Sequence, residues 1–380
     1  MRNRLHRWIS LCLISLFAAA YLPPQSVIAA SPVVKHILII QAFTPDYLAN
    51  EQYIKGLKDK LDVDTRYKFS YSYEYFDMAR HFKEEDYLDK LAQYMEMKYK
   101  AGQPDFIVMQ GDMLQFMEKY GKQMFPGVPA IIASDENNLL AGQEPSNYVF
   151  ISQSNYSERN IRLIMETRPM TKQIYIVIGD SPFERNIIRY LQKEEKQYAD
   201  RVKFVYMNKW SYGQILEAVE NAREDSAILY FRRISDVEGE NFIPEQAVKT
   251  ITREAKAPVY GTEGHNLGSG IIGGYVRENE ITGQAAAEAI FDLLGGKKPS
   301  DIPVIKITPC RYVFDWRQLK RWGIDEKKLP ESSRVDYRVE SFWELYSPYI
   351  VGTLVLLLLQ ALLIFGLLVN QRRRKKAEKN

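Results

Sequence analysis

The segment Gln173-Ile-Tyr-Ile-Val-Ile-Gly-Asp-Ser-Pro-Phe-Glu184 decides the fold class. Its first part, Gln173–Gly179, is a continuous run of mostly branched apolar residues, which is typical of a strand that is covered on both faces. Ser181-Pro-Phe-Glu184 then has the pattern of a capping box, with proline at the first helical position. A buried strand that passes directly into a capped helix predicts a parallel α/β unit.

The same alternation extends along most of the chain. Nine further β-rich runs are predicted, at His36–Ile40, Lys68–Phe76, Asp105–Gln110, Ala130–Ser134, Tyr148–Ser152, Val202–Met207, Ala227–Phe231, Pro258–Gly261 and Gly270–Val276. Stretches with helical spacing separate them, and helix starts are expected at Thr44-Pro45, Asp112, Ser211 and Asn279. We therefore expect an α/β fold with parallel sheets flanked by helices.

Composition narrows the class of function. The 380 residues are enough for two lobes plus membrane segments. The net charge is +3, and part of the positive excess lies at the two ends of the chain. The middle of the chain is therefore not basic, and nucleic acid is not expected as a partner. Cys12 and Cys310 lie far apart and are not expected to pair, so Cys310 is expected to be a buried strand residue.

An apolar segment at the N-terminus has the parts of a secretory signal. Arg2, Arg4 and Arg7 precede the apolar run Trp8–Leu22, and small residues follow at Ala29-Ala30. The run is short for a spanning helix, which needs about 20 residues. Residues 1–30 are thus interpreted as a cleaved signal peptide, with an uncleaved N-terminal anchor as the alternative.

A second apolar segment, Tyr349–Val369, is long enough to cross a bilayer. Trp343 and Tyr346 precede it, as in an aromatic belt, and Arg372–Lys376 follow it. Because positive flanks stay in the cytoplasm, we expect residues 31–348 outside the cell membrane and residues 370–380 inside. Either fate of the N-terminal segment leaves this orientation unchanged.

Several of these segments resemble the ABC transporter substrate-binding protein family, which has the type I periplasmic binding protein fold. The resemblance covers about residues 33–330 and rests on an ordered series of segments: His36–Pro45, Asp105–Asp112, Phe125–Ser134, Ile174–Asp180, Ala257–Gly261 and Ile305–Pro330. Ser341–Tyr346, with the apolar helix after it, resembles the junction in membrane histidine kinases that carry this domain outside the cell. No kinase segment follows in the sequence, so any signal is expected to pass to a partner.

The resemblance implies two lobes that close on a ligand. Lobe one is placed at about 33–147 and 277–300 and lobe two at about 153–264, with Tyr148–Ser152 and Gly270–Val276 as crossing strands. Residues 331–348 would be a juxtamembrane linker. Ile305–Phe314 is expected as a strand pair.

The candidate ligand-binding residues follow strand ends, where open α/β sheets bind ligands. They are Gln41, Phe43, Thr44, Gly111, Asp112, Ser134, Asp135, Asp180, Ser181, Tyr260 and Thr262. Capping hydroxyls with free backbone N–H groups suit a carboxylate, and nearby acids suit an ammonium group. For each single cap, helix capping alone is an equal alternative. As a set they indicate an amino acid or similar small zwitterion.

Other chemistry is not supported by the motifs. Gly268-Ser-Gly-Ile-Ile-Gly273 matches the dinucleotide fingerprint by letter, but the residues after it read as a strand and not as a helix. The four histidines have no metal spacing, so no metal, cofactor or catalytic role is expected. Two functions stay open: a membrane-anchored sensory receptor, and a tethered solute-binding protein that delivers ligand to an ABC permease.

Overall fold

The lobe that contains the N-terminal strand is built on a six-stranded sheet. The computed structural model describes residues 32–81, 84, 86–111, 113–135, 147–153, 157–233, 236–239, 242–339 and 342–377. In the first lobe every described strand pairing is parallel, in the order β11-β5-β4-β3-β1-β2. The strands are β1 (Val33–Gln41), β2 (Tyr67–Tyr75), β3 (Phe106–Gln110), β4 (Ala130–Asp135), β5 (Tyr148–Gln153) and β11 (Ile305–Ile307).

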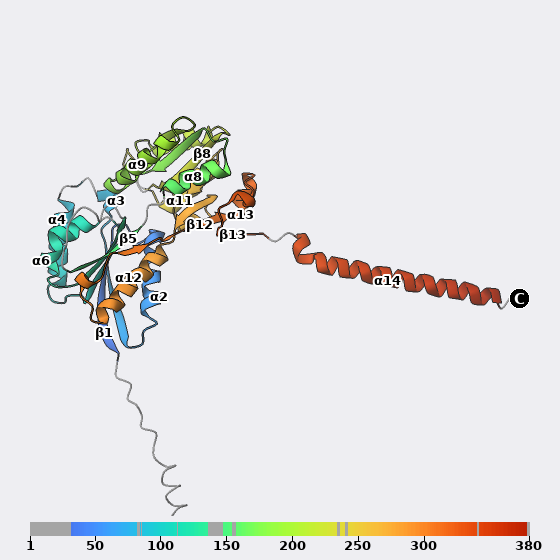
Figure 1. The fold of residues 1–380 in the computed structure, drawn as a ribbon, viewed down its shortest axis with the longest axis horizontal. Coiled ribbons are helices and arrows are strands. Elements are labelled where there is room, and N and C mark those ends of the chain that lie inside the picture. The colour runs from blue at the N-terminus through green and yellow to red at the C-terminus, as the bar shows by residue number, and fades with distance from the viewer. Residues whose placement is uncertain are drawn as a thin grey trace, which may run out of the picture.

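Helices cover both faces of this sheet (Figure 1). On one face, α2 (Leu48–Leu61) and α12 (Asn279–Leu294) pack on alternate residues of β1, β3, β4 and β5. The other face is covered by α4 (Tyr87–Tyr99), α5 (Leu114–Phe116), the π-helix η1 (Met117–Gly121) and α6 (Lys122–Met124), and α3 (Met78–His81) follows β2. Because both faces are buried, Ile37–Ile40 of β1 and Phe106–Met109 of β3 are uninterrupted apolar runs.

The second lobe repeats the architecture with four parallel strands in the order β7-β6-β8-β9. The strands are β6 (Gln173–Ile178), β7 (Lys203–Tyr206), β8 (Ser226–Arg232) and β9 (Val259–Gly261). The helices are α8 (Ser157–Thr167), α9 (Pro182–Glu194), η2 (Glu195–Gln197), α10 (Tyr212–Glu220) and α11 (Pro244–Glu254). Helices α8 and α9 cover one face, while α10 and α11 cover the other.

A third, smaller sheet was not predicted. Strand β10 (Gly273–Arg277) pairs antiparallel with β12 (Cys310–Asp315), and β12 pairs parallel with β13 (Arg334–Asp336). Phe314 of β12 and Leu319 of α13 (Trp316–Arg321) are buried in the core of the second lobe. The expected strand pair Ile305–Phe314 is therefore split, because β11 joins the first sheet and β12 joins the third. Short 3-10 turns η3 (Gly264–Asn266), η4 (Pro299–Asp301) and η5 (Glu326–Lys328) complete this region.

The crossings also differ in detail from the expected ones. Tyr148–Gln153 is strand β5, hydrogen-bonded between β4 and β11 inside the first sheet, so the first lobe extends to Gln153 before the chain leaves it. Strand β10 does begin after the glycine-rich segment, which therefore precedes a strand and not a helix. Cys310 is a buried strand residue, as expected.

Two of the predicted capping boxes are present in full. Ser181 and Glu184 exchange both capping contacts at α9, and Ser211 does the same with Gln214 at α10. Thr44-Pro45 does not begin a helix: α2 starts at Leu48, because Thr44 lies in a turn whose carbonyl accepts hydrogen bonds from the Tyr47 N–H and the Asn50 Nδ2. Glu278 occupies the N-cap position of α12, and Asn279 is its first residue.

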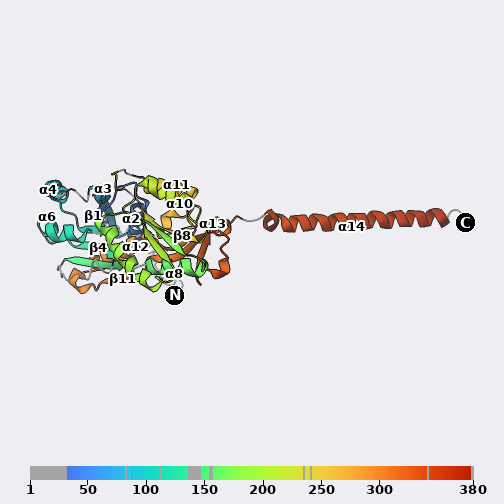
Figure 2. The same cartoon turned by 90° about the horizontal axis from the view of Figure 1, so that it is seen from above.

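The last described element is one long helix, α14 (Phe342–Ala377). It contains the candidate span Tyr346–Lys375, whose most apolar 18-residue window has a mean hydropathy of 2.6 and is not buried in the protein, so by length and composition the helix can cross a membrane. It projects away from the two lobes in both views (Figures 1 and 2). The N-terminal segment 1–31, Asp112 and residues 378–380 lie outside the described residues.

Candidate functional site

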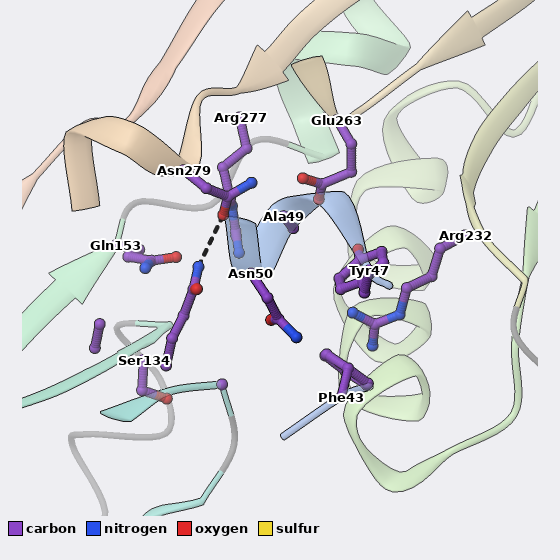
Figure 3. A pocket seen from close by; sticks show the side chains of 13 residues that line it. Phe43, Tyr47, Ala49, Asn50, Ser134, Gln153, Arg232, Glu263, Arg277 and Asn279 are labelled. Atoms are coloured by element: carbon purple, nitrogen blue, oxygen red, sulfur yellow. Dashed lines mark hydrogen bonds between the residues drawn. The ribbon is translucent and has the colours of Figure 1, made fainter. Parts of the chain in front are cut away.

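A pocket opens between the two lobes, at the carboxyl ends of the parallel strands. About 500 Å³ of empty space lies between its walls, a figure that includes open solvent at the mouth. Both lobes and the third sheet contribute to its lining (Figure 3), which consists of Phe43, Tyr47, Ala49, Asn50, Gln110, Gly111, Ala133, Ser134, Gln153, Arg232, Glu263, Arg277 and Asn279. Lobe one supplies most of the uncharged polar groups, and the charged ones follow β8, β9 and β10.

The wall from lobe one begins where its strands end. Gln110 and Gln153 end β3 and β5 on the face that α12 covers. The Gln110 Nε2 donates to the Asn279 Oδ1 at 2.8 Å, and the Gln153 Nε2 donates to the Thr282 hydroxyl at 3.4 Å. Both contacts hold the first turn of α12 over the strand ends.

Gly111 shows why the chain can turn into this wall. It follows β3 with φ of +99°, in the left-handed region that favours glycine. A Cβ atom there would lie 3.0 Å from the Ala42 Cβ. Gly111 thus lets the loop after β3 pass close to the loop after β1, and both loops reach the pocket.

The start of α2 contributes aromatic and amide groups. Tyr47 occupies the N-cap position and Phe43 lies in the loop before it, with their rings edge to face at 5.3 Å between centroids. Asn50 lies in the first turn of the helix and is held by its hydrogen bond to the Thr44 carbonyl oxygen. Phe43 and Tyr47 are the aromatic surface of the pocket.

Arg232, the last residue of β8, brings a buried positive charge from lobe two. Its Nε donates to the Glu184 Oε1 at 2.8 Å, and these side chains are 11% and 5% exposed. Its guanidinium also lies 4.3 Å from the centroid of the Phe43 ring, a cation–π contact that joins the two lobes. Burial is the largest single effect and acts to lower the pKa of Arg232, but Glu184 and Tyr47 together outweigh it, so the net pKa is above the usual value.

Glu263 and Arg277 bring opposite charges to the top of the pocket. Glu263 follows β9 and Arg277 ends β10, and their backbones form an isolated parallel bridge. The side chains are 7% and 9% exposed. Burial is the main reason that the pKa of the Tyr47 hydroxyl is raised, and Glu263 raises it further. Tyr47 is therefore a neutral hydroxyl at physiological pH.

His265 lies beside Tyr47 at one side of the pocket. Its ring lies edge to face with Tyr47 at 5.4 Å between centroids, which is a second aromatic contact across the lobes. Burial and the nearby Arg232 charge lower the pKa of His265 to about 4. The imidazole is accordingly neutral near pH 7.

The pocket includes three of the residues expected from the sequence: Phe43, Gly111 and Ser134. Gln41 lies next to it in the sheet, in register with Gln110, and is 1% exposed. Asp112 and the side chain of Asp135 lie outside the described residues. Ligand contact by these residues stays a prediction.

The other five expected residues have different surroundings and are absent from the pocket lining. Thr44 forms the turn before α2, and Ser181 caps α9. Asp180 accepts from the Asn208 Nδ2 at 2.7 Å and lines a separate surface hollow. Tyr260 is fully buried in the core of lobe two, with its hydroxyl hydrogen-bonded to Thr167, and the Thr262 N–H is bonded to the Tyr230 carbonyl oxygen.

Several lining residues were missed in the sequence, although some carried a signal. Gln153, Arg232 and Arg277 directly follow predicted strands, so the rule that selected Asp180 would also have selected them. Asn50 and Asn279 carried no comparable signal, because single amides are common at helix starts. Among the described residues no group of three His, Cys, Asp or Glu side chains is placed to hold a metal ion.

Taken together, the pocket combines a polar uncharged wall, an aromatic surface and buried charges of both signs. Such a lining is suited to holding a small polar molecule between two lobes. The two contacts between the lobes, Arg232 on Phe43 and Tyr47 on His265, lie at its side.

Comparison with known proteins assigns the family. A family model described as ABC transporter substrate binding protein matches residues 54–331, well over half of the chain. This chain belongs to the ABC transporter substrate-binding protein family. The lobed α/β architecture is that of type I periplasmic binding proteins, as expected from the resemblance.

Solved structures share the fold of this substrate-binding protein at low identity. The ABC domain from Streptococcus pneumonia, solved in complex with L-Trp, is 18% identical with a TM-score of 0.57. A conserved domain protein from Vibrio cholerae is 17% identical with the same score, and each comparison covers 79% of this chain and 99% of the other. The ligand-free, open structure of a substrate-binding protein with adhesive properties from Clostridium difficile is 15% identical with a TM-score of 0.54, covering 79% of this chain and 98% of that one. No curated protein matches the sequence.

Proposed function

We propose that this chain is a membrane-anchored receptor that binds an amino acid or similar small zwitterion outside the cytoplasm and reports its presence to a partner. The observation that carries the ligand class is the pocket lining, in which Arg232 and Arg277 offer positive charge and Glu263 offers negative charge. A carboxylate and an ammonium group can therefore both find a counter-charge there. The L-Trp complex of a protein with the same fold is consistent with this class.

The full-length chain in detergent provides a direct test. A ligand that binds only the folded state raises the melting temperature, with a stabilisation of about 2.7 kcal/mol at a hundredfold excess over Kd. We expect at least one amino acid to do so at millimolar concentration, and Arg232→Met to remove the shift. Arg185→Met is the matched control, because Arg185 is half-exposed and lines a separate hollow. Absence of a shift with every amino acid would rule out the zwitterion.

The membrane anchor is proposed from helix α14. Its apolar window carries a polybasic end at Arg372–Lys376, which favours the cytoplasmic side. Alkaline carbonate extraction should leave the chain in the membrane fraction, and a cysteine-reactive label that cannot cross the bilayer should reach Ser300→Cys in intact cells or spheroplasts. Release of the chain by carbonate would contradict the anchor.

Sensing is favoured over delivery by the path from pocket to helix. Arg277 of the pocket ends β10, β10 pairs with β12, and β12 pairs with β13, which ends six residues before α14 begins. Lobe closure can therefore move the segment that leads into the membrane. Hydrogen exchange at residues 334–345 should change when ligand binds. If it does not change, delivery to an ABC permease becomes the better reading, with α14 serving as an anchor.

A further inference from the structure

The lobe-one side of the pocket is a continuous wall of carboxamides. Asn50, Gln110, Gln153 and Asn279 all line the pocket, and we call these four side chains the carboxamide wall. They come from two helices and two strands that lie far apart in the sequence. Ser134, at the end of β4, adds a hydroxyl beside them (Figure 3).

The wall holds hydrogen-bonding capacity that the described part of the chain does not use. The Gln110 Oε1, the Asn279 Nδ2 and the Ser134 Oγ are buried and have no hydrogen-bond partner among the described residues. Ser134 is 4% exposed and Asn279 is 2% exposed. A spare acceptor, a spare donor and a hydroxyl that can do either are thus carried by three side chains that line one pocket.

This complement does not depend on how the amides are oriented. With the Gln110 Nε2 donating to the Asn279 Oδ1, one acceptor is left on Gln110 and one donor on Asn279. Turning both amides over would reverse the bond and leave a donor on Gln110 and an acceptor on Asn279. In each case one donor and one acceptor face the ligand.

Anchoring of α12 is the simpler explanation of the wall, and it accounts for only part of it. The bonds from Gln110 to Asn279 and from Gln153 to Thr282 fix the helix start. They do not explain why the remaining polar atoms are kept buried, since a buried group without a partner destabilises the fold. A ligand that supplied the missing partners would offset that cost in the bound state.

Two charges of the pocket lie on the side of lobe two. Arg232 and Glu263 extend from there, whereas Arg277 of the third sheet lies in the same part of the view as Asn279 (Figure 3). A charged ligand group is accordingly expected near Arg232 and Glu263, and an uncharged group that both donates and accepts hydrogen bonds is expected near the carboxamide wall. Carboxamides and hydroxyls have this chemistry.

We propose that the carboxamide wall and Ser134 make the site selective for ligands with an uncharged hydrogen-bonding group, a hydroxyl or a carboxamide, at the end away from Arg232 and Glu263. Resting on the zwitterion proposal, this narrows the ligand to amino acids with polar, uncharged side chains. A site built to hydrogen-bond a substrate group rejects the analogue that lacks it much more strongly than an apolar pocket rejects an added methyl group.

Matched ligand pairs test the selectivity on the full-length chain in detergent. L-threonine is compared with L-valine, and L-asparagine with L-leucine, because the members of each pair are close in size and differ in the polar group. We expect the polar member of at least one pair to bind at least tenfold more tightly by calorimetry. The threonine–valine pair tests selectivity for a hydroxyl, and the asparagine–leucine pair tests selectivity for a carboxamide.

Ser134→Ala should reduce the preference to less than threefold. Ser226→Ala is the control, since Ser226 is also a buried strand serine whose hydroxyl has no hydrogen-bond partner among the described residues, at the start of β8 and not in the pocket lining. If Ser134→Ala does not fold, Gln110→Met offers a second variant of similar size, with the same expected loss of preference.

Each outcome decides. Equal or tighter binding of valine and leucine would overturn the proposal while leaving the zwitterion site in place. If no amino acid binds but a polyol such as ribitol does, the zwitterion is wrong and the selectivity of the wall stands. Failure of both amino acids and polyols to bind would overturn both.

Discussion

Replacing Glu184 by glutamine separates the two tasks of that side chain. The Glu184 Oε2 accepts from the Ser181 N–H at 2.8 Å in the capping box, while the Oε1 accepts from the Arg232 Nε at 2.8 Å. Glutamine keeps an oxygen for the cap but removes the negative charge. Arg232, whose side chain is 11% exposed, then keeps a buried positive charge without its counter-ion.

The expected magnitude follows from this burial. Breaking a buried ion pair by removing one partner costs about 3–5 kcal/mol, because the other charge is left uncompensated. At about 2–4 °C per kcal/mol for a domain of this size, the melting temperature should fall by roughly 10 °C. Arg232→Met should also destabilise, whereas the double variant Glu184→Gln/Arg232→Met removes both charges of the pair. The double variant should therefore recover at least about 2 kcal/mol relative to the sum of the single changes.

Thermal unfolding of the full-length chain, followed by circular dichroism in one detergent, measures all four proteins of this cycle. Glu254→Gln is the control, because its partner Arg253 is 71% exposed and surface pairs contribute at most about 1 kcal/mol. The reasoning fails if Glu184→Gln melts within 2 °C of the parent, or if the two single effects add in the double variant. Additivity would mean that Glu184 and Arg232 do not depend on each other.

Three further predictions concern stability. His265 has a pKa of about 4 in the folded chain against about 6.5 when unfolded. Its contribution to the free energy of unfolding is therefore complete above pH 6.5 and is lost as the pH falls towards 4, by up to about 3 kcal/mol. His265→Gln should flatten that part of a pH series of melting temperatures, and an unchanged slope would contradict the assignment. Arg233 is fully buried and donates to the carbonyl oxygens of Ile178, which ends β6, and of Met207 and Trp210, which follow β7. Arg233→Met should therefore cost more than about 3 kcal/mol, whereas the exposed Arg253→Met should be nearly neutral in the same melting assay. A Cβ on Gly283 would lie 2.1 Å from a backbone oxygen of α2, so Gly283→Ala should lower the melting temperature by several degrees. Gly213 has open space around it, so Gly213→Ala should raise the melting temperature slightly. Equal effects of the two substitutions would refute the close contact of α2 and α12.

The sequence was sufficient for most strands of the two main sheets because most of them are apolar runs in a fixed order. Each of the ten predicted β-rich segments is a strand within a few residues of its expected bounds. The third sheet escaped prediction because β13 is only three residues long and is charged at both ends. A strand so short carries no periodicity, and its pairing with β12 is decided by tertiary packing.

The pocket was harder to predict than the fold, for reasons that its residues show. Phe43, Gly111 and Ser134 lie at or just after strand ends and were found by that rule. Tyr260 is one residue from the end of β9, but its side chain is fully buried in lobe two and its hydroxyl is bonded to Thr167, so proximity in sequence did not give access to the pocket. Asn279 reaches the pocket from a helix that returns to lobe one late in the chain, and such long-range placement has no local signal.

The connector between the third sheet and the membrane helix has a physical consequence of its own. Strand β13 ends at Asp336 and α14 begins at Phe342, so five residues intervene, which span at most about 20 Å when fully extended. With α14 in a bilayer, the two-lobed domain is held close to the membrane surface and meets any partner in that membrane by lateral diffusion. Tethering of this kind raises the local concentration of both partners without any new contact. A docking surface too weak to survive detergent extraction would therefore still be occupied in the intact membrane.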